Sequence, residues 1–348
     1  MCIRDSCDGY AAAVAAGQAP VNCCVAGGQE AADKIAAIMG VSAGAEEKMV
    51  AFVPCSGAEG VAVKRFNYKG PQDCQAAMLF GGKSNKECRF ACIGLGNCAR
   101  ACKFGAMHIV NGVAKVDRDK CVACGQCLVS CPFGAIVDKG QIFQVIQSIL
   151  KGDRVIAIVA PAFIGQFSGK VSPGKFVTAM KQLGFDRVME VAIGADLCTI
   201  EEAKDFLEKV PEKQDYMATS CCPAWHSMIE KLFPGEMHKI SMTLTPMVFT
   251  ARMVKKDFPG CKVVFVGPCA AKKLEAIRAD IRSDVDFVLT FEELQGMFEA
   301  KQIDFDTVEE QDYLNEGTSA GRGFAVSGGV AKAVTDLVHE QYPDMEIQ

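Results

Sequence analysis

Two runs of four cysteines constrain this chain more than any other feature. The first run consists of Cys88, Cys92, Cys98 and Cys102. The second run consists of Cys121, Cys124, Cys127 and Cys131, with Pro132 directly after it. The second spacing and its proline form the bacterial pattern for cubane iron–sulfur clusters, in which the fourth cysteine binds the other cluster. We therefore expect this part of the chain to fold around metal clusters.

Exchange of the fourth ligand divides these eight cysteines into two sets. We expect one [4Fe–4S] cluster on Cys88, Cys92, Cys98 and Cys131. We expect a second [4Fe–4S] cluster on Cys121, Cys124, Cys127 and Cys102. The tripeptide Phe-Gly-Ala follows both runs, at 104–106 and at 133–135, as in a duplicated ferredoxin half. Two such clusters indicate electron transfer.

Other interpretations of the cysteines are weaker. A disulfide framework belongs to small secreted domains and does not suit a chain of 348 residues. Two Cys-x-x-Cys hooks are able to hold a tetrahedral zinc ion, but the proline and the repeated tripeptide favour clusters. Cys55 and Cys74 match no metal-binding spacing, so we expect them to be buried structural thiols.

The composition limits the classes of function. The length suggests about two or three domains, and 50% hydrophobic residues allow a packed core outside the metal region. The net charge of −5 argues against nucleic acid as a partner and gives no polybasic signal for a membrane surface. The sequence shows no apolar span and no signal peptide. These features predict a cytoplasmic, anaerobic redox protein whose membrane association would be peripheral only.

The N-terminal part carries a first resemblance. Cys-Asp-Gly-Tyr at 7–10, Cys24 with a Gly-Gly pair at 27–28, and the stretch 81–102 form one pattern. This pattern resembles the B subunit of Rnf-type electron-transport complexes over about residues 7–140. The resemblance implies that residues 1–40 are the remnant of a four-iron domain in which Cys7 and Cys24 bind a cluster. The family has two more cysteines before Cys7, so we expect a truncated start.

The resemblance also divides the region that follows. Residues 41–80 would be a linker or a small α+β segment, with short strands at 50–53 and 61–63. Residues 81–140 would form a small α+β ferredoxin-type domain with two [4Fe–4S] clusters.

After residue 142 the pattern changes to alternating strands and helices. Apolar runs at 155–160 and 263–266 predict buried parallel strands, and 199–210 and 291–300 predict helices with acidic first turns. We expect residues 141–348 to form a two-lobed α/β domain. Ligands in such domains bind beyond the carboxyl ends of the strands, where Cys269 falls.

Two motifs in this domain carry a second resemblance. Thr-Ser-Cys-Cys-Pro-Ala-Trp at 219–225 and Gly-Pro-Cys-Ala-Ala-Lys-Lys at 267–273 resemble the first two signature motifs of the [FeFe]-hydrogenase catalytic domain. That family holds a [4Fe–4S] cluster joined to a di-iron unit, together called the H-cluster. The resemblance implies that Cys222 and Cys269 bind the cluster, that Cys221 passes protons and that Lys272 hydrogen-bonds a cyanide ligand. Glu202, Asp205 and Ser241 fall on the family's outward proton path.

Purely structural roles for these residues also stay open. Cys221 and Cys222 would then be small buried residues, and Glu202 and Asp205 a solvated helix face. The sequence also departs from the family. Gly267 replaces a methionine found in many catalytic members, and the chain ends at Gln348 before the third motif, which supplies two more cysteines. We therefore expect this fragment to be inactive alone.

Two functions follow from these resemblances. In the first, the ferredoxin half exchanges electrons between partner redox proteins and a hydrogenase-like centre, for reversible hydrogen oxidation and proton reduction or for hydrogen sensing. In the second, the chain is a non-catalytic electron-transfer subunit of an Rnf-like redox complex.

Overall fold

The computed structural model describes residues 28–41, 50–167, 171–278, 281, 284–310, 317–345 and 347, and the isolated positions 11, 14–16 and 21. Cys7 and Cys24 lie outside the described residues. Within the first forty residues the structure describes the helix α2 (Gly28–Met39).

A small cysteine-rich domain contains a β-hairpin and short helices. Its elements are α3 (Cys74–Gly81), α4 (Asn97–Ala101), β1 (Met107–Val110), β2 (Val113–Val116) and α5 (Gln126–Val129). β1 and β2 pair antiparallel, and both turn residues, Asn111 and Gly112, have positive φ, as a type I′ turn requires. α4 and α5 each begin after a left-handed glycine, Gly96 and Gly125, both with φ of 82°. The two cysteine runs therefore form a structural repeat.

The strands expected at 50–53 and 61–63 are wrong. This segment forms only isolated bridges, between Phe52 and Val137 and between Lys64 and Lys86. The side chains of Val61 and Val63 are largely exposed, so their alternation does not mark the buried face of a sheet. The Lys86 ammonium fixes the segment instead.

Lys86 is a buried lysine that joins three stretches of backbone. Its Nζ donates to the carbonyl oxygens of Gly57 at 2.5 Å, Cys92 at 2.6 Å and Gly112 at 3.3 Å. Only 3% of the residue is exposed. Three acceptors offset the cost of burying its charge, and they attach the segment to the first cysteine loop and to the hairpin turn.

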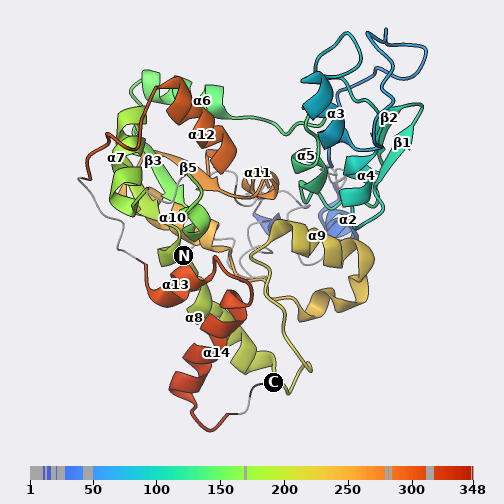
Figure 1. Ribbon diagram of the computed structural model, residues 1–348. Coiled ribbons are helices and arrows are strands. Elements are labelled where there is room, and N and C mark those ends of the chain that lie inside the picture. The colour runs from blue at the N-terminus through green and yellow to red at the C-terminus, as the bar shows by residue number, and fades with distance from the viewer. Residues whose placement is uncertain are drawn as a thin grey trace.

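The rest of the chain is an α/β domain around one four-stranded parallel sheet. The strands are β3 (Val155–Val159), β4 (Arg187–Glu190), β5 (Lys262–Gly267) and β6 (Phe287–Thr290), in the order β4-β3-β5-β6. The helices are α6 (Ile142–Leu150), α7 (Pro173–Leu183), α8 (Ala192–Lys209), α9 (Pro223–Leu232), α10 (Pro246–Asp257), α11 (Ala271–Ala276), α12 (Phe291–Ala300), α13 (Ser319–Gly323) and α14 (Gly329–Gln341), with 3-10 turns η1 (Pro161–Phe163) and η2 (Pro234–Lys239). The expected mixed α/β class is confirmed. In Figure 1 the cysteine-rich domain and the sheet lie on opposite sides of α11.

The predicted strands agree closely with β3 and β5, and the helix at 291–300 is α12. Thr290 and Glu293 form a capping box at its start, which explains the acidic first turn. The other predicted helix begins earlier than expected, at Ala192 rather than at 199. Its first half is apolar and buried, and carries no capping signal. Glu202 therefore lies in the middle of a buried helix.

Hydrophobic packing divides this domain into two parts. A large cluster surrounds the sheet, with Phe176, Met180, Leu289 and Leu294 fully buried in it. A smaller cluster joins α8 to α14 through Ala203, Val334 and Val338. None of the described helices is both long enough and apolar enough to span a bilayer.

Candidate functional site

The second hydrogenase-like motif lies where the strand order of the parallel sheet reverses. The chain runs from β3 outward to β4 and then returns to β5 on the other side of β3, so the strand order reverses between β3 and β5. Ligands of open α/β sheets bind beyond the carboxyl ends of strands at such a point. Cys269 follows the end of β5 there, and α11 begins two residues later.

Lys272 on α11 reaches the other motif. Its Nζ donates to the carbonyl oxygen of Cys221 at 2.9 Å and pairs with the Glu275 carboxylate at 2.6 Å. Thr245 Oγ1 donates to the second oxygen of Glu275 at 2.5 Å. The side chains of Lys272 and Glu275 are 13% and 1% exposed. A fixed positive charge therefore lies beside the two vicinal cysteines.

The three cysteines of this region differ in exposure. Cys222 is exposed and caps the start of α9, where Pro223 is the first helical residue. Burial raises the pKa of Cys269, and the nearby Cys222 raises it further. Burial also raises the pKa of Cys221, against the opposing effect of Lys272. Burial therefore favours the neutral thiol form of Cys221, which directly precedes Cys222 in the chain.

Gly267 is the last residue of β5, two positions before Cys269. A Cβ at Gly267 would lie 2.5 Å from the ring of Phe265 and 3.3 Å from Cβ of Ala160. A methionine at Gly267 would therefore require Phe265 to move.

Glu202 is a buried carboxyl with one oxygen left unbonded. The residue is 1% exposed, and its Oε2 has no hydrogen-bond partner among the described residues. Burial raises the pKa of Glu202 to about 7, assisted by Asp205 and opposed by a hydrogen bond from the Ser241 side chain. An acid with this pKa exchanges its proton near neutral pH.

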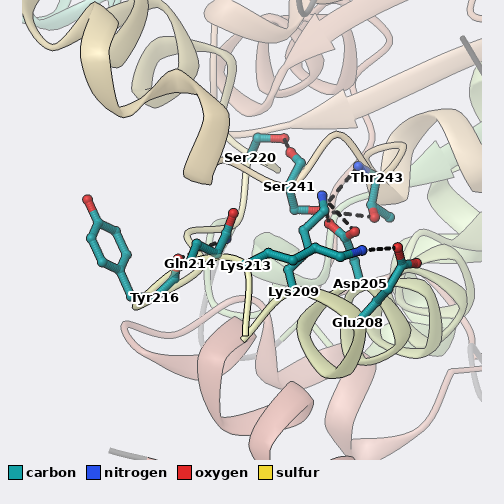
Figure 2. A network of polar contacts seen from close by, with 9 residues as sticks. All are labelled: Asp205, Glu208, Lys209, Lys213, Gln214, Tyr216, Ser220, Ser241 and Thr243. Carbon is teal, nitrogen blue, oxygen red and sulfur yellow. Dashed lines mark hydrogen bonds and ion pairs between the residues drawn. The ribbon is translucent and has the colours of Figure 1, made fainter. Parts of the chain in front are cut away.

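Polar side chains lead from Glu202 toward solvent. Ser241 is fully buried, and its Oγ lies 3.0 Å from Thr243 Oγ1. Asp205 lies one turn further along α8, with a side chain 21% exposed, and pairs with Lys209 at 2.7 Å. Figure 2 shows Asp205 and Lys209 on α8 beside Ser241 and Thr243. Exposure therefore increases from the buried Glu202 and Ser241 to Asp205.

Cys198 is a residue near this site that the sequence analysis missed. It lies four positions before Glu202 on α8 and is 1% exposed. Burial raises the pKa of its thiol, and Glu202 and Cys221 both contribute to that increase. Cys198 therefore lies near both residues. The helical i, i+4 spacing from Glu202 is the signal that would have found it.

The thiols of the cysteine-rich domain lie in two groups. A cavity in this domain is lined by Cys92, Cys98 and Cys131, as expected for the first cluster, and also by Cys74. Cys88 is exposed and does not line this cavity.

The second group contains Cys121, Cys124 and Cys127. The pKa of Cys127 is raised to about 11, mainly by burial and in part by the neighbouring Cys121 and Cys124. Backbone N–H groups donate to two of the sulfurs, from Ala51 to Cys121 at 3.4 Å and from Ala106 to Cys102 at 3.3 Å. Such donors are typical of cluster-binding thiolates. Within the described residues, no three Cys, His, Asp or Glu side chains are arranged to hold a single metal ion.

The second cysteine loop contacts the hydrogenase-like site. A Cβ built on Gly125, between Cys124 and Cys127, would lie 3.8 Å from Cβ of Ala270. Ala270 is the residue after Cys269. The two sets of candidate ligands are therefore on adjacent loops.

Two lysines of the α/β domain hold this contact. Lys231 on α9 donates to the Cys121 carbonyl oxygen at 2.5 Å. Lys273 on α11 pairs with Asp138 at 2.7 Å and with Glu293 at 2.8 Å.

Known proteins are similar to both parts of this chain. The family model for the C-terminal domain of the iron-only hydrogenase large subunit matches residues 153–348, and a 4Fe-4S binding domain matches residues 113–136. The chain is 31% identical over 235 residues to the NADP-reducing hydrogenase subunit HndD of Solidesulfovibrio fructosivorans, covering 59% of this chain and 40% of that protein. It is 35% identical over 142 residues to a probable cytosolic Fe-S cluster assembly factor of Aedes aegypti, covering 36% and 30%.

A solved structure gives the same result. An apo [FeFe]-hydrogenase from Chlamydomonas reinhardtii is 26% identical, with a TM-score of 0.51 over 58% of each chain. The chain spans about half or less of the length of its curated relatives. Since the first family model matches more than half of the residues, the chain belongs to the family defined by the C-terminal domain of the iron-only hydrogenase large subunit, and it carries a 4Fe-4S binding domain before that region.

Proposed function

We propose that this chain transfers electrons through iron–sulfur clusters to and from an [FeFe]-hydrogenase-type centre. The reaction would be reversible hydrogen oxidation and proton reduction, or hydrogen sensing in the same site. The contact between Lys272 and Cys221 carries this proposal. A domain that only binds a [4Fe–4S] cluster needs neither a spare buried thiol nor a buried ammonium beside it.

Each residue of the site has a role in this proposal. Cys222 and Cys269 would hold a [4Fe–4S] cluster, and the effect of Cys222 on the pKa of the Cys269 thiol supports their proximity. When bound, the di-iron unit supplies the place where protons and electrons combine. The buried thiol of Cys221 would hold the proton there, and the Lys272 ammonium would donate a hydrogen bond to an anionic ligand.

The proton would leave through the buried carboxyl of Glu202. Ser241 and the partly exposed Asp205 would connect that carboxyl to the surface. A raised pKa near neutrality suits Glu202 to accept and release protons. The thiol of Cys198, which lies near both Glu202 and Cys221, would connect the two.

Electrons would enter through the cysteine-rich domain. The cluster on Cys121, Cys124, Cys127 and Cys102 would be the one next to the hydrogenase-like site, because the Gly125 loop contacts Ala270. The cluster that involves Cys92, Cys98 and Cys131 would be farther along the path and would exchange electrons with partner redox proteins.

The wider organisation belongs to the same proposal. Residues 1–40 would be a four-iron remnant with Cys7 and Cys24 as ligands, 41–80 a connecting segment, 81–140 the ferredoxin-type domain and 141–348 the hydrogenase-like domain. Residues 7–140 would derive from an Rnf-type B subunit. Many free thiols suit a reducing, cytoplasmic location.

Infrared spectroscopy tests the proposal. Anaerobic protein that carries the family's third motif would be matured with di-iron cofactor and scanned for metal carbonyl and cyanide bands. Bands are expected. Their absence, with iron and sulfide still present in cubane proportions, would overturn the hydrogenase-type centre and leave the non-catalytic electron-transfer role.

A further inference from the structure

The first cysteine loop lacks one ligand of the bacterial pattern. The two loops correspond at one constant offset along the sequence, and the glycines before α4 and α5 follow the same offset. The matching pairs are Cys92 with Cys121, Cys98 with Cys127, and Cys102 with Cys131. At the same offset Leu95 matches Cys124, and Cys88 matches Asp117. The repeat therefore places Cys88 outside the ligand positions and leaves a non-ligand at one of them.

Leu95 does not line the cavity that contains Cys92 and Cys98. The Leu95 side chain lines a different cavity, together with Lys64, Asn67 and Tyr68. The preceding Gly94 has a φ of +79°, and a Cβ there would lie 2.8 Å from the carbonyl oxygen of Gly112. Close packing on the hairpin turn therefore fixes the backbone at Gly94, and Leu95 is absent from the lining of the first cavity although its neighbours Ile93 and Gly96 belong to it.

Cys74 fills the gap from another helix. It is the first residue of α3, and its backbone N–H donates to Asn97 Oδ1 at 2.9 Å. Asn97 Nδ2 in turn donates to Asp73 Oδ2 at 2.9 Å, and Arg100 donates to Asn97 Oδ1 at 2.5 Å. Asp73 is the N-cap of α3, and Asn97 is the first residue of α4. This network fixes the start of α3 against the residue that precedes Cys98.

The result is a cavity with four thiols. Its lining contains Cys74, Cys92, Cys98 and Cys131, with apolar side chains that include Ile93, Ile109, Phe133 and Ile136. One thiolate for each iron is the ligand count of a [4Fe–4S] cluster, and an apolar wall suits its burial.

We propose that Cys74 is the fourth ligand of the first [4Fe–4S] cluster, with Cys92, Cys98 and Cys131, and that Cys88 is a free surface thiol. This rests on the proposed function only in requiring that the cysteine-rich domain binds clusters. It extends the ferredoxin-type unit to include α3, which would bring a ligand to the cluster from outside the eight-cysteine pattern.

Paired alanine variants test the assignment. Cys74→Ala and Cys88→Ala would be prepared anaerobically from the whole chain, with iron and sulfide assayed and the reduced clusters observed by electron paramagnetic resonance. Cys74→Ala is expected to lose about four iron atoms per chain and the signal of one cluster. Cys88→Ala should keep the wild-type content. The reverse pattern, or full cluster content in Cys74→Ala, overturns the assignment.

A measurement on the wild-type chain covers the case in which Cys74→Ala does not fold. Alkylation rates of individual cysteines would be compared by mass spectrometry before and after iron chelation without denaturant. The rate at Cys74 should rise at least tenfold on chelation, while exposed Cys88 should react quickly in both states. A rise at Cys88 with no change at Cys74 would refute the proposal. A wild-type chain without iron or sulfide would instead refute cluster binding itself.

Discussion

Lys272 and Cys221 are 51 positions apart in the chain, and the lysine Nζ donates to the cysteine carbonyl oxygen at 2.9 Å. The same ammonium pairs with the buried Glu275, so one charge serves both the fold and the site. These two roles are separable by mutation.

Lys272→Met should destabilise the α/β domain by ~3–5 kcal/mol, because it leaves the Glu275 carboxylate buried without its partner. Chemical denaturation of the domain measures this change. Lys332→Met is a matched control, since its pair with Asp336 is exposed and should contribute less than ~1 kcal/mol.

A second substitution separates stability from chemistry. Lys272→Met combined with Glu275→Gln removes both charges and should recover most of the lost stability. It should not recover carbonyl and cyanide bands in matured protein, because the donor for the anionic ligand is still missing. Full recovery of the bands would show that Lys272 acts only through Glu275.

Cys221→Ala should lower hydrogen turnover by a factor on the order of 10²–10⁴ in protein that carries the third motif, because it removes a positioned proton carrier. Iron content should not change. Cys261→Ala is the control, since Cys261 is also buried but lies in the core around the sheet. Equal loss in both variants would indicate a packing effect instead.

Glu202→Gln should change the pH dependence of stability. The pKa of Glu202 is raised from 4.5 to about 7 by burial, so the native state favours the protonated form. That contribution is fully present below the unfolded-state pKa and is lost as pH rises through about 7. Glutamine cannot ionise, so the variant should gain stability relative to wild type between pH 5 and pH 8, by at most ~3 kcal/mol.

Thermal unfolding at several pH values measures this gain. Glu201→Gln, on the exposed side of the same helix turn, should show no such trend, because its pair with Lys204 is on the surface. A constant difference between Glu202→Gln and wild type across the pH range would contradict the buried acid.

Iron chelation should unfold the cysteine-rich domain and leave the sheet intact. The hydrophobic cluster of this domain is small and contains several of the cysteines themselves, whereas the sheet has a large apolar core. Hydrogen exchange should therefore lose protection across residues 80–140 and keep it in β3 and β5. Unchanged protection at 88–131 after complete iron removal would contradict this.

The sequence predicts those elements whose signals are local. Continuous apolar runs identify β3 and β5, and the capping residues Thr290 and Glu293 identify α12. The start of α8 has no such signal, because burial against α10 stabilises its apolar first turns. Alternating apolar residues at 61–63 mislead, since nothing among the described residues covers the side chains of Val61 and Val63.

Some residues of the candidate sites follow from sequence motifs, and others are found only from the structure. Motif spacing locates Cys221 and Lys272, and the structure adds their contact. Spacing along the sequence does not identify Cys74 as a ligand, because a hydrogen bond to Asn97, 23 positions later, holds α3 at the cavity. Cys198 is missed because its position near Cys221 depends on how α8 packs.

The three hydrogen bonds from Lys86 to backbone carbonyl oxygens determine how long a segment must be moved to transfer the cysteine-rich domain to another protein. A graft cut at residue 81 would keep the ammonium, together with the acceptors on Cys92 and Gly112, but would lose the acceptor on Gly57. It would also discard Cys74. A graft that begins at residue 50 retains all of them. The segment needed to transfer the electron-transfer domain is therefore longer than its ferredoxin pattern.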